Sequence, residues 1–218
     1  RASERERLTI LAGWSAAVDA PSRIAIAESL TVRYPNEPEG YTWLAGARNS
    51  SGDFLGAVAP LRKVIRMDSP PLRDSERKDG PPVRCHACIA YLMLVGTYAY
   101  MDSLPAALRT AEEWQRAQPQ APEPAGQVSW VLMLAGRYRE ALIADQAVIS
   151  RDPGLVRDGF RVQVWLRAGD FAAAFDAQLV STTQLTVVNE GAVSGLGSNV
   201  KTIYVDLQND GAANNIGH

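Results

Sequence analysis

The stretch that decides the fold is residues 38–70, which have the sequence PEGYTWLAGARNSSGDFLGAVAPLRKVIRMDSP. Apolar and small residues recur at helical spacing on both sides of Gly52: Tyr41, Leu44, Ala45, Ala57, Leu61 and Val64. Glycine at the turn takes a positive φ without a Cβ clash, and proline at the end cannot continue the second helix. The stretch therefore predicts two antiparallel helices joined by a short turn.

This pattern recurs along the chain with a period near 34 residues. Prolines after the second helix of each pair are Pro35, Pro70, Pro119 and Pro153, at intervals of 35, 49 and 34; removing a 15-residue insertion from 49 leaves 34. The turns are predicted at Gly52, Asp102, Gly136 and Gly169. Two amphipathic helices, 4–19 and 22–34, are expected ahead of Pro35. Since no pair can bury its apolar stripe alone, the pairs are expected to stack.

This period, with small residues such as Ala57, Ala107 and Ala141 at the close helix contacts, resembles the tetratricopeptide repeat (TPR) family. The opening ERERL and the junction YP-x-x-PEG-Y resemble TPR regions of bacterial signalling proteins, which often accompany a eukaryotic-like Ser/Thr kinase or a cyclase domain. The resemblance covers about residues 3–175. It implies an all-α solenoid of antiparallel helix pairs in a right-handed superhelix. No kinase motif is found in the sequence itself.

The predicted domains are a TPR-like helical domain at 1–180, with an insertion loop at 69–84, and a C-terminal tail at 181–218. The loop SPPLRDSERKDGPPVR is rich in proline and charge, so it cannot continue a helix. Two interpretations stay open for it: a tolerated surface loop, or a contact specific to one partner.

Composition narrows the function classes. The 218 residues are 46% hydrophobic and carry 22 Lys and Arg against 24 Asp and Glu, so a globular chain is expected and nucleic acid is not expected as a ligand. No apolar run is long enough to span a bilayer, and RASERERL lacks the pattern of a signal peptide. Because the chain begins at Arg1 without a Met, we expect a fragment or a processed chain.

No catalytic constellation is evident. The histidines are His86 and His218, neither lies beside a nucleophile motif, and the carboxylates do not gather into an acid–base pair. The sequence thus predicts a protein that is not an enzyme and that needs no cofactor or metal.

The segment Cys85-His86-Ala87-Cys88 leaves alternatives open. The two cysteines are either small buried residues at i and i+3 on one helix face or a local disulfide at the helix start, and metal or redox chemistry is the least favoured. A disulfide would imply an extracytoplasmic or extracellular location, and free thiols a cytoplasmic one.

Two sets of residues are candidates for contacts. In a TPR stack the first helix of each pair lines the concave face, which makes partner-binding candidates of Arg48, Asn49, Thr97 and Arg161. After about Val180 the helical period stops, and residues 184–189 and 201–207 are predicted as strands. This tail offers assembly candidates at Leu185, Val187, Ile203, Tyr204 and Val205.

Two functions follow from these predictions. The first is a scaffold that binds a protein or peptide partner. The alternative is a structural subunit that assembles end to end into a filament, with its tail on the neighbouring copy. Copies of the chain itself are therefore among the expected partners.

Overall fold

The computed structural model describes residues 3–68, 85–152 and 158–174, together with two short strands at 204–206 and 215–217. The chain divides into two compact units, 1–155 and 156–218. The predicted insertion loop at 69–84 lies outside the described residues, as does most of the predicted tail. The predicted domain boundary near residue 180 stays a prediction for the same reason.

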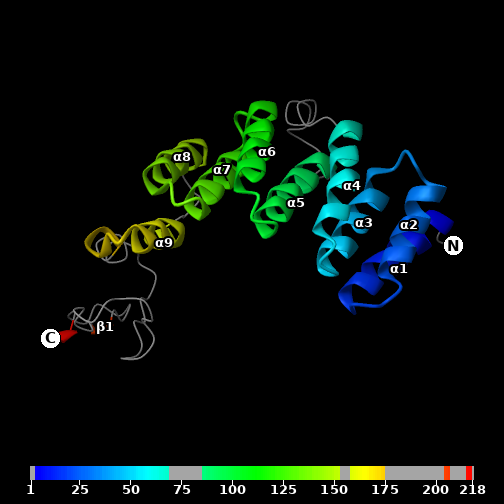
Figure 1. Cartoon of the computed structure of the whole chain (residues 1–218), viewed down its shortest axis with the longest axis horizontal. Coiled ribbons are helices and arrows are strands. Elements are labelled where there is room, and N and C mark those ends of the chain that lie inside the picture. The colour runs from blue at the N-terminus through cyan, green and yellow to red at the C-terminus, as the bar shows by residue number, and fades with distance from the viewer. Residues whose placement is uncertain (1–2, 69–84, 153–157, 175–203, 207–214, 218) are drawn as a thin grey trace. The chain divides into compact units, whose positions relative to one another are not determined.

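The first unit contains four helix pairs in its described part (Figure 1). The pairs are α1 (Glu4–Ala17) with α2 (Arg23–Arg33), α3 (Pro38–Ser50) with α4 (Phe54–Met67), α5 (His86–Tyr100) with α6 (Leu104–Ala117), and α7 (Pro122–Leu134) with α8 (Tyr138–Arg151). The predicted all-α solenoid of helix pairs is therefore confirmed. Pro35 and Pro119 follow the ends of α2 and α6, as expected.

One residue in each turn between paired helices has a positive φ. The predicted turn residues Gly52, Asp102, Gly136 and Gly169 have φ of 81°, 55°, 73° and 77°. Asp19 has φ 51° and occupies the same place in the first pair, so α1 ends at Ala17 and not at residue 19. Glycine and aspartate are among the few residues that tolerate this conformation, which explains their recurrence there.

Pro60 lies inside α4, an unusual place for proline. Its missing N–H leaves the carbonyl of Gly56, four residues earlier, without its helical donor. The Nη1 atom of Arg48 on α3 donates to that carbonyl oxygen at 2.8 Å. A side chain of the first helix thus completes the backbone hydrogen bonds of the second.

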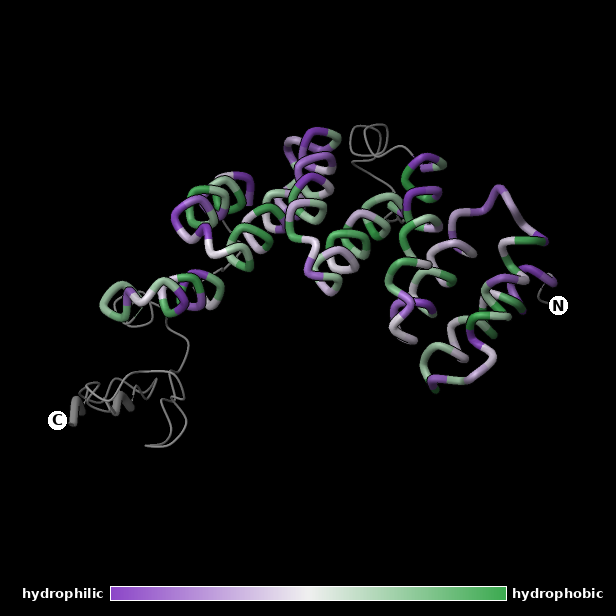
Figure 2. The backbone as a smooth tube through the Cα atoms, viewed as in Figure 1, coloured by the Kyte–Doolittle hydropathy of each residue, from purple (hydrophilic) through white to green (hydrophobic). Residues whose placement is uncertain are grey.

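The core of the second and third pairs is made of residues that the repeat pattern predicts. Tyr41, Ala45, Ala57, Leu61 and Val64 form one buried cluster with Ala90 and Leu94 of α5. Figure 2 shows α5 as hydrophobic along most of its length, whereas α6 carries hydrophilic positions. Small residues let neighbouring helices approach, and the larger ones fill the space between them.

The second unit contains α9 (Asp158–Ala168), a helical turn at 171–174 and two strands in its described part. Strands β1 (Tyr204–Asp206) and β2 (Asn215–Gly217) pair antiparallel, with Val205 opposite Ile216. The strand predicted at 201–207 is thus present in shortened form. Its partner strand was not predicted; Asn215–Gly217 supplies the β-branched Ile216 for the pairing. The strand predicted at 184–189 lies outside the described residues.

Candidate protein-binding site

The first helices of the pairs form a row within the first unit. Helix α1 contacts α3, α3 contacts α5, and α5 contacts α7, while α2, α4 and α6 each pack against the first helix of the next pair. Each first helix in the middle of the row therefore has neighbours on several sides. The face of that row left uncovered is the candidate binding surface.

On α5 the uncovered face is apolar. Leu92 is 48% exposed and Tyr100 is 77% exposed, although six of the 15 residues of α5 are buried. Gly96 lies between them at i+4 of Leu92, and a Cβ placed on Gly96 would meet nothing within 4 Å. Tyr100 stacks on Phe54 of α4, with ring centroids 5.6 Å apart, which fixes its orientation. We call Leu92, Gly96 and Tyr100, with half-buried Ile89, the α5 surface.

The neighbouring first helices present different chemistry at the same repeat positions. The turn residues Gly52 and Asp102 are 50 residues apart. Thr42, Gly46 and Ser50 of α3 therefore correspond to Leu92, Gly96 and Tyr100 of α5. In α7, which follows α5 after one repeat of 34 residues, Trp130 corresponds to Gly96 and Leu134 to Tyr100. A ligand lying along this row would meet polar groups on α3 and apolar groups on α5 and α7. Gly96 at the centre of α5 leaves room for close approach, whereas a Cβ on Gly46 of α3 would lie 3.7 Å from the Met93 side chain.

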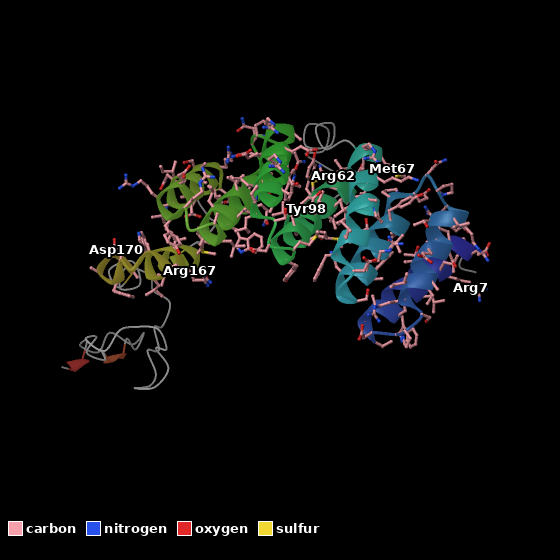
Figure 3. The ribbon with its side chains drawn as sticks, in the orientation of Figure 1. Arg7, Arg62, Met67, Tyr98, Arg167 and Asp170 are labelled. Atoms are coloured by element: carbon pink, nitrogen blue, oxygen red, sulfur yellow. A yellow bond between two sulfur atoms is a disulfide. The ribbon has the colours of Figure 1, made fainter. Side chains whose placement is uncertain are left out.

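A polar network behind α5 holds this helix in place. Arg62 of α4 donates from Nη1 to Glu113 Oε2 of α6 at 2.7 Å, and from Nη2 to Thr110 Oγ1 at 3.2 Å. The hydroxyl of Tyr91 on α5 donates to the other oxygen of Glu113 at 3.0 Å. Arg62 is also hydrogen-bonded to Tyr98 of α5, and Figure 3 labels these two residues close to each other in the middle of the unit. Three helices therefore share one carboxylate.

The network changes the acidity of its members. Burial raises the pKa of Tyr91, and the charge and hydrogen bond of Glu113 raise it further, against smaller opposing effects of Arg62 and Arg116. Burial by itself lowers the pKa of Arg62, but hydrogen bonds to Glu113 and Tyr98 outweigh it and the pKa is raised. Tyr91 therefore stays a neutral donor and Arg62 a cation throughout the physiological range.

Cys85 and Cys88 are joined by a disulfide at the start of α5, with Cα atoms 5.2 Å apart. The Cys85 sulfur also accepts the N–H of Cys88 at 3.1 Å and so caps the helix. Across the insertion, the carboxylate of Asp68 accepts the N–H of Ala87 at 3.1 Å. Both ends of the insertion are thus anchored to the first turn of α5. The presence of the bridge in the purified protein stays a prediction.

Three of the predicted partner-binding residues make contacts inside the unit. Arg48 bonds to Gly56, and also to Glu28 Oε1 of α2 at 3.3 Å. The amide of Asn49 donates to Thr97 Oγ1 at 2.9 Å, which joins α3 to α5. Thr97 is buried, so it does not reach a partner unless these helices separate. Arg48 and Asn49 remain partly exposed and border the row of first helices.

The other predicted contact residues lie in the second unit. Arg161 is on α9 and is partly buried. Tyr204 and Val205 are in β1. Leu185, Val187 and Ile203 lie outside the described residues. The prediction that these tail residues make assembly contacts stays a prediction.

The described residues limit the chemistry of the site. They contain no group of three or more His, Cys, Asp and Glu side chains placed to hold a metal ion. Among the described helices, none is both long enough and apolar enough to cross a bilayer. The exposed face of α5 offers an apolar contact area and a tyrosine hydroxyl. Such groups bind a partner by burial of surface and by hydrogen bonding.

Comparison with solved structures finds TPR proteins. MamA (residue 41 to the end) from Desulfovibrio magneticus RS-1 has a TM-score of 0.58 at 14% identity, over 82% of this chain and 93% of that chain. TTC0263, a TPR protein of Thermus thermophilus, has a TM-score of 0.55 at 15% identity, over 80% and 88%. The chain has the TPR fold. No protein-family model matches the sequence, and comparison with curated proteins gives no match.

The repeat pattern of the TPR did not single out Leu92, Gly96 and Tyr100. Their spacing of four residues places them on one helix face, but α5 is apolar on every side. The exposed face of such a helix is decided by where α4, α6 and α7 lie. Only Gly96 was a signal in the sequence, since glycine inside a helix is costly unless space is needed.

Proposed function

We propose that this TPR chain is a non-enzymatic scaffold that holds a segment of another protein on the exposed face of α3 and α5. The observation that carries the proposal is the α5 surface, where Leu92 and Tyr100 remain exposed on either side of an open glycine. Tyrosine and leucine beside an open position make a site that an apolar side chain of a partner can fill.

The chemistry of the row suggests which partner segment fits. An apolar side chain would lie over Gly96 between Leu92 and Tyr100. One helix away, the hydroxyl oxygens of Thr42 and Ser50 would accept hydrogen bonds from the backbone or a polar side chain of the same segment. We propose a short amphipathic segment as the ligand, with its apolar residue on α5 and its polar residue toward α3.

The test uses peptides selected from a displayed random library on the immobilised chain, with affinity measured by fluorescence anisotropy. Leu92→Glu places a charge on the α5 surface and Gly96→Arg fills its open centre. Each change is expected to weaken the selected peptides by about tenfold or more, since a tenfold loss is only about 1.4 kcal/mol. Leu55→Glu, at an exposed leucine of α4, is the matched control and should leave affinity within about twofold.

Circular dichroism of all three variants shows whether each one is folded, so that a loss of binding can be distinguished from a loss of structure. If folded Leu92→Glu and Gly96→Arg bind every selected peptide as well as the parent chain, then the ligand does not lie on α5. In that case the proposed site is wrong even if the chain is a scaffold.

A second candidate function is end-to-end assembly into a filament. What supports it is an uncovered apolar face on α1, at one end of the helix row. A filament needs two different complementary surfaces that do not close. Light scattering across a concentration series tests it, because a filament subunit grows without limit and deletion of 181–218 should dissolve the polymers.

The parent protein of the chain and its cellular location are also proposals. The ERERL opening and the YP-x-x-PEG-Y junction support a parent related to bacterial signalling proteins, in which the TPR region would recruit a partner to a catalytic domain. The Cys85–Cys88 bridge supports an extracytoplasmic or extracellular location, since disulfides persist in oxidising compartments. Mass analysis of alkylated protein, purified without reductant, tests the bridge directly.

A further inference from the structure

Helix α1 carries a second uncovered apolar surface, separate from the one on α5. Three of its residues, Ile10, Leu11 and Trp14, are exposed, and so is Val18, which caps its C-terminus. At about 100° per residue, these four and Arg7 fall within an arc of roughly 100° around the helix. Residues 8–18, LTILAGWSAAV, contain no charged side chain. A helix that is apolar on all sides is normally buried on all sides.

Two of these positions, those of Leu11 and Trp14, are buried in every later pair of the unit. Trp14, Ala47, Thr97 and Val131 each lie five residues before the turn residue. Trp14 is 58% exposed, whereas the other three are 4%, 1% and 0% exposed. Leu11 is likewise exposed, although its equivalents Leu44, Leu94 and Val128 are buried.

What buries those later positions is the preceding helix pair. Thr97 of α5 bonds to Asn49 of α3, and Gly40 of α3 lies against Leu30 of α2. Within the described residues, nothing equivalent lies before α1. The α1 surface (Arg7, Ile10, Leu11, Trp14 and Val18) therefore has the shape and chemistry of a face that receives another helix.

The charged residues at the two ends of α1 indicate what kind of helix this surface receives. Arg7 makes no ion pair with any residue in the described part of the chain and is labelled at the edge of the unit in Figure 3. Asp19, at the opposite end, contacts Arg23 at 3.0 Å but keeps 79% of its side chain exposed, so a carboxylate oxygen remains accessible. The positive and negative ends are 12 residues apart, or about 18 Å along the helix axis.

We propose that the α1 surface binds the α1 surface of a second copy of this chain, with the two helices antiparallel about a two-fold axis. In that register Arg7 of each copy lies level with Asp19 of the other. Leu11 of each copy lies within about one residue of Trp14 of the other. The surface is thus complementary to itself in charge and in apolar content, as a two-fold interface requires. Tryptophan and arginine are the residues that carry most binding energy at such interfaces.

This interface is closed, unlike the contact in a filament. Each copy uses its only α1 surface, so association stops at two chains. The two α5 surfaces stay free, and the dimer presents two binding sites for partner segments. Bivalent presentation raises the apparent affinity for a partner that carries two ligand segments.

The experiment is light scattering coupled to size exclusion on the full chain, over a concentration series and at low and high salt. The chain has a mass of 23.6 kDa, so a dimer has twice that mass. Ile10→Glu is expected to produce monomers. Ile143→Glu on α8 is the matched control, because Ile10 and Ile143 are 67% and 66% exposed; it should remain dimeric. Arg7→Glu, which sets a second carboxylate against Asp19 of the other copy, should weaken dimerisation about tenfold or more. It should also reverse the salt dependence, because salt screens the repulsion between the two carboxylates.

Three outcomes overturn the proposal. A monomer at all concentrations means that the α1 surface is covered by something else, such as an amphipathic helix of another protein. Masses that keep growing with concentration mean a contact that does not close. A dimer that Ile10→Glu and Arg7→Glu leave intact lies on another surface. The proposed function is tested separately, because Leu92→Glu should weaken peptide binding by about tenfold or more while the dimer persists.

Discussion

The first and third helix pairs follow the same repeat plan, yet their surfaces differ. Leu11 of α1 and Leu94 of α5 occupy the same position, eight residues before the turn, and only Leu94 is fully buried. The third pair has neighbours on both sides, whereas the first pair has one on a single side within the described residues. In a repeat protein, burial is thus a property of the neighbouring pair as much as of the residue itself.

Truncating the two equivalent leucines gives the largest expected difference. Leu94→Ala should lower the free energy of unfolding by about 2–5 kcal/mol, because it leaves a cavity among fully buried neighbours. Leu11→Ala should cost less than about 1 kcal/mol in the monomer, since its side chain is already partly in water. Urea denaturation of both variants, at a concentration where the chain is monomeric, measures the difference. Equal losses would mean that α1 is packed as fully as α5.

A second comparison concerns the position four residues before the turn, occupied by Ser15 in α1 and Arg48 in α3. The Ser15 hydroxyl bonds within its own helix, to Ala12, while Arg48 supplies the donor that Pro60 lacks. Arg48→Met should therefore destabilise the fold by about 2 kcal/mol, and Ser15→Ala by less. In a Pro60→Ala background the new N–H can reach Gly56, so the loss from Arg48→Met should fall to about 1 kcal/mol. A double-mutant cycle measures this coupling, and strict additivity would contradict it.

The N-termini of α1 and α5 are fixed by different devices. Ser3 Oγ accepts the N–H of Glu6 in a capping box, whereas the Cys85 sulfur accepts the N–H of Cys88 within a disulfide. Reduction should lower stability by about 1 kcal/mol, below the roughly 2 kcal/mol that chain entropy allows for a four-residue ring. The measurement is the urea midpoint with and without reductant, with the double variant Cys85→Ser and Cys88→Ser as control. A reductant effect that persists in the control would not come from the bridge.

The smallest effect is the pH dependence that Tyr91 gives to the third pair. Its pKa is raised in the folded state, so the folded chain holds this proton more tightly than the unfolded chain does. The stabilisation is complete below about pH 10, the ordinary range of the tyrosine pKa, and is lost as the pH rises toward the folded value. At about pH 10.5 the loss should be about 0.8 kcal/mol. Tyr91→Phe should remove that part of the slope between about pH 9 and 10.5; an unchanged slope would show that Tyr91 does not contribute.

The sequence predicted much of the fold because the TPR plan is local. A turn residue with positive φ every 33 or 34 residues, apart from the insertion, and small residues at the close contacts are signals that one pair carries by itself. Asp19 was included in the predicted helix 4–19, although Asp102 was recognised as a turn, because the first pair follows the repeat pattern less closely than the later ones. The strand β2 was not predicted, since strand pairing depends on a partner strand that local composition does not reveal.

The candidate sites could be predicted only in part. Arg48 and Asn49 were correctly placed on first helices, but the prediction treated their polar side chains as available to a partner. The structure uses Arg48 to satisfy a carbonyl and Asn49 to bond Thr97. Polar residues near helix contacts have such internal roles because buried donors and acceptors are costly when unpaired.

The sequence by itself determined the helix pairs, their turns and the apolar stripes that they stack on, since these follow from backbone conformation and helical period. Tertiary structure alone decided which apolar residues remain exposed. Leu92, Tyr100, Ile10 and Trp14 belong to helices that are apolar on more than one side, and no local signal distinguishes their faces. Exposure on such a helix depends on whether another pair lies against it, and that is settled only when all the pairs are in place.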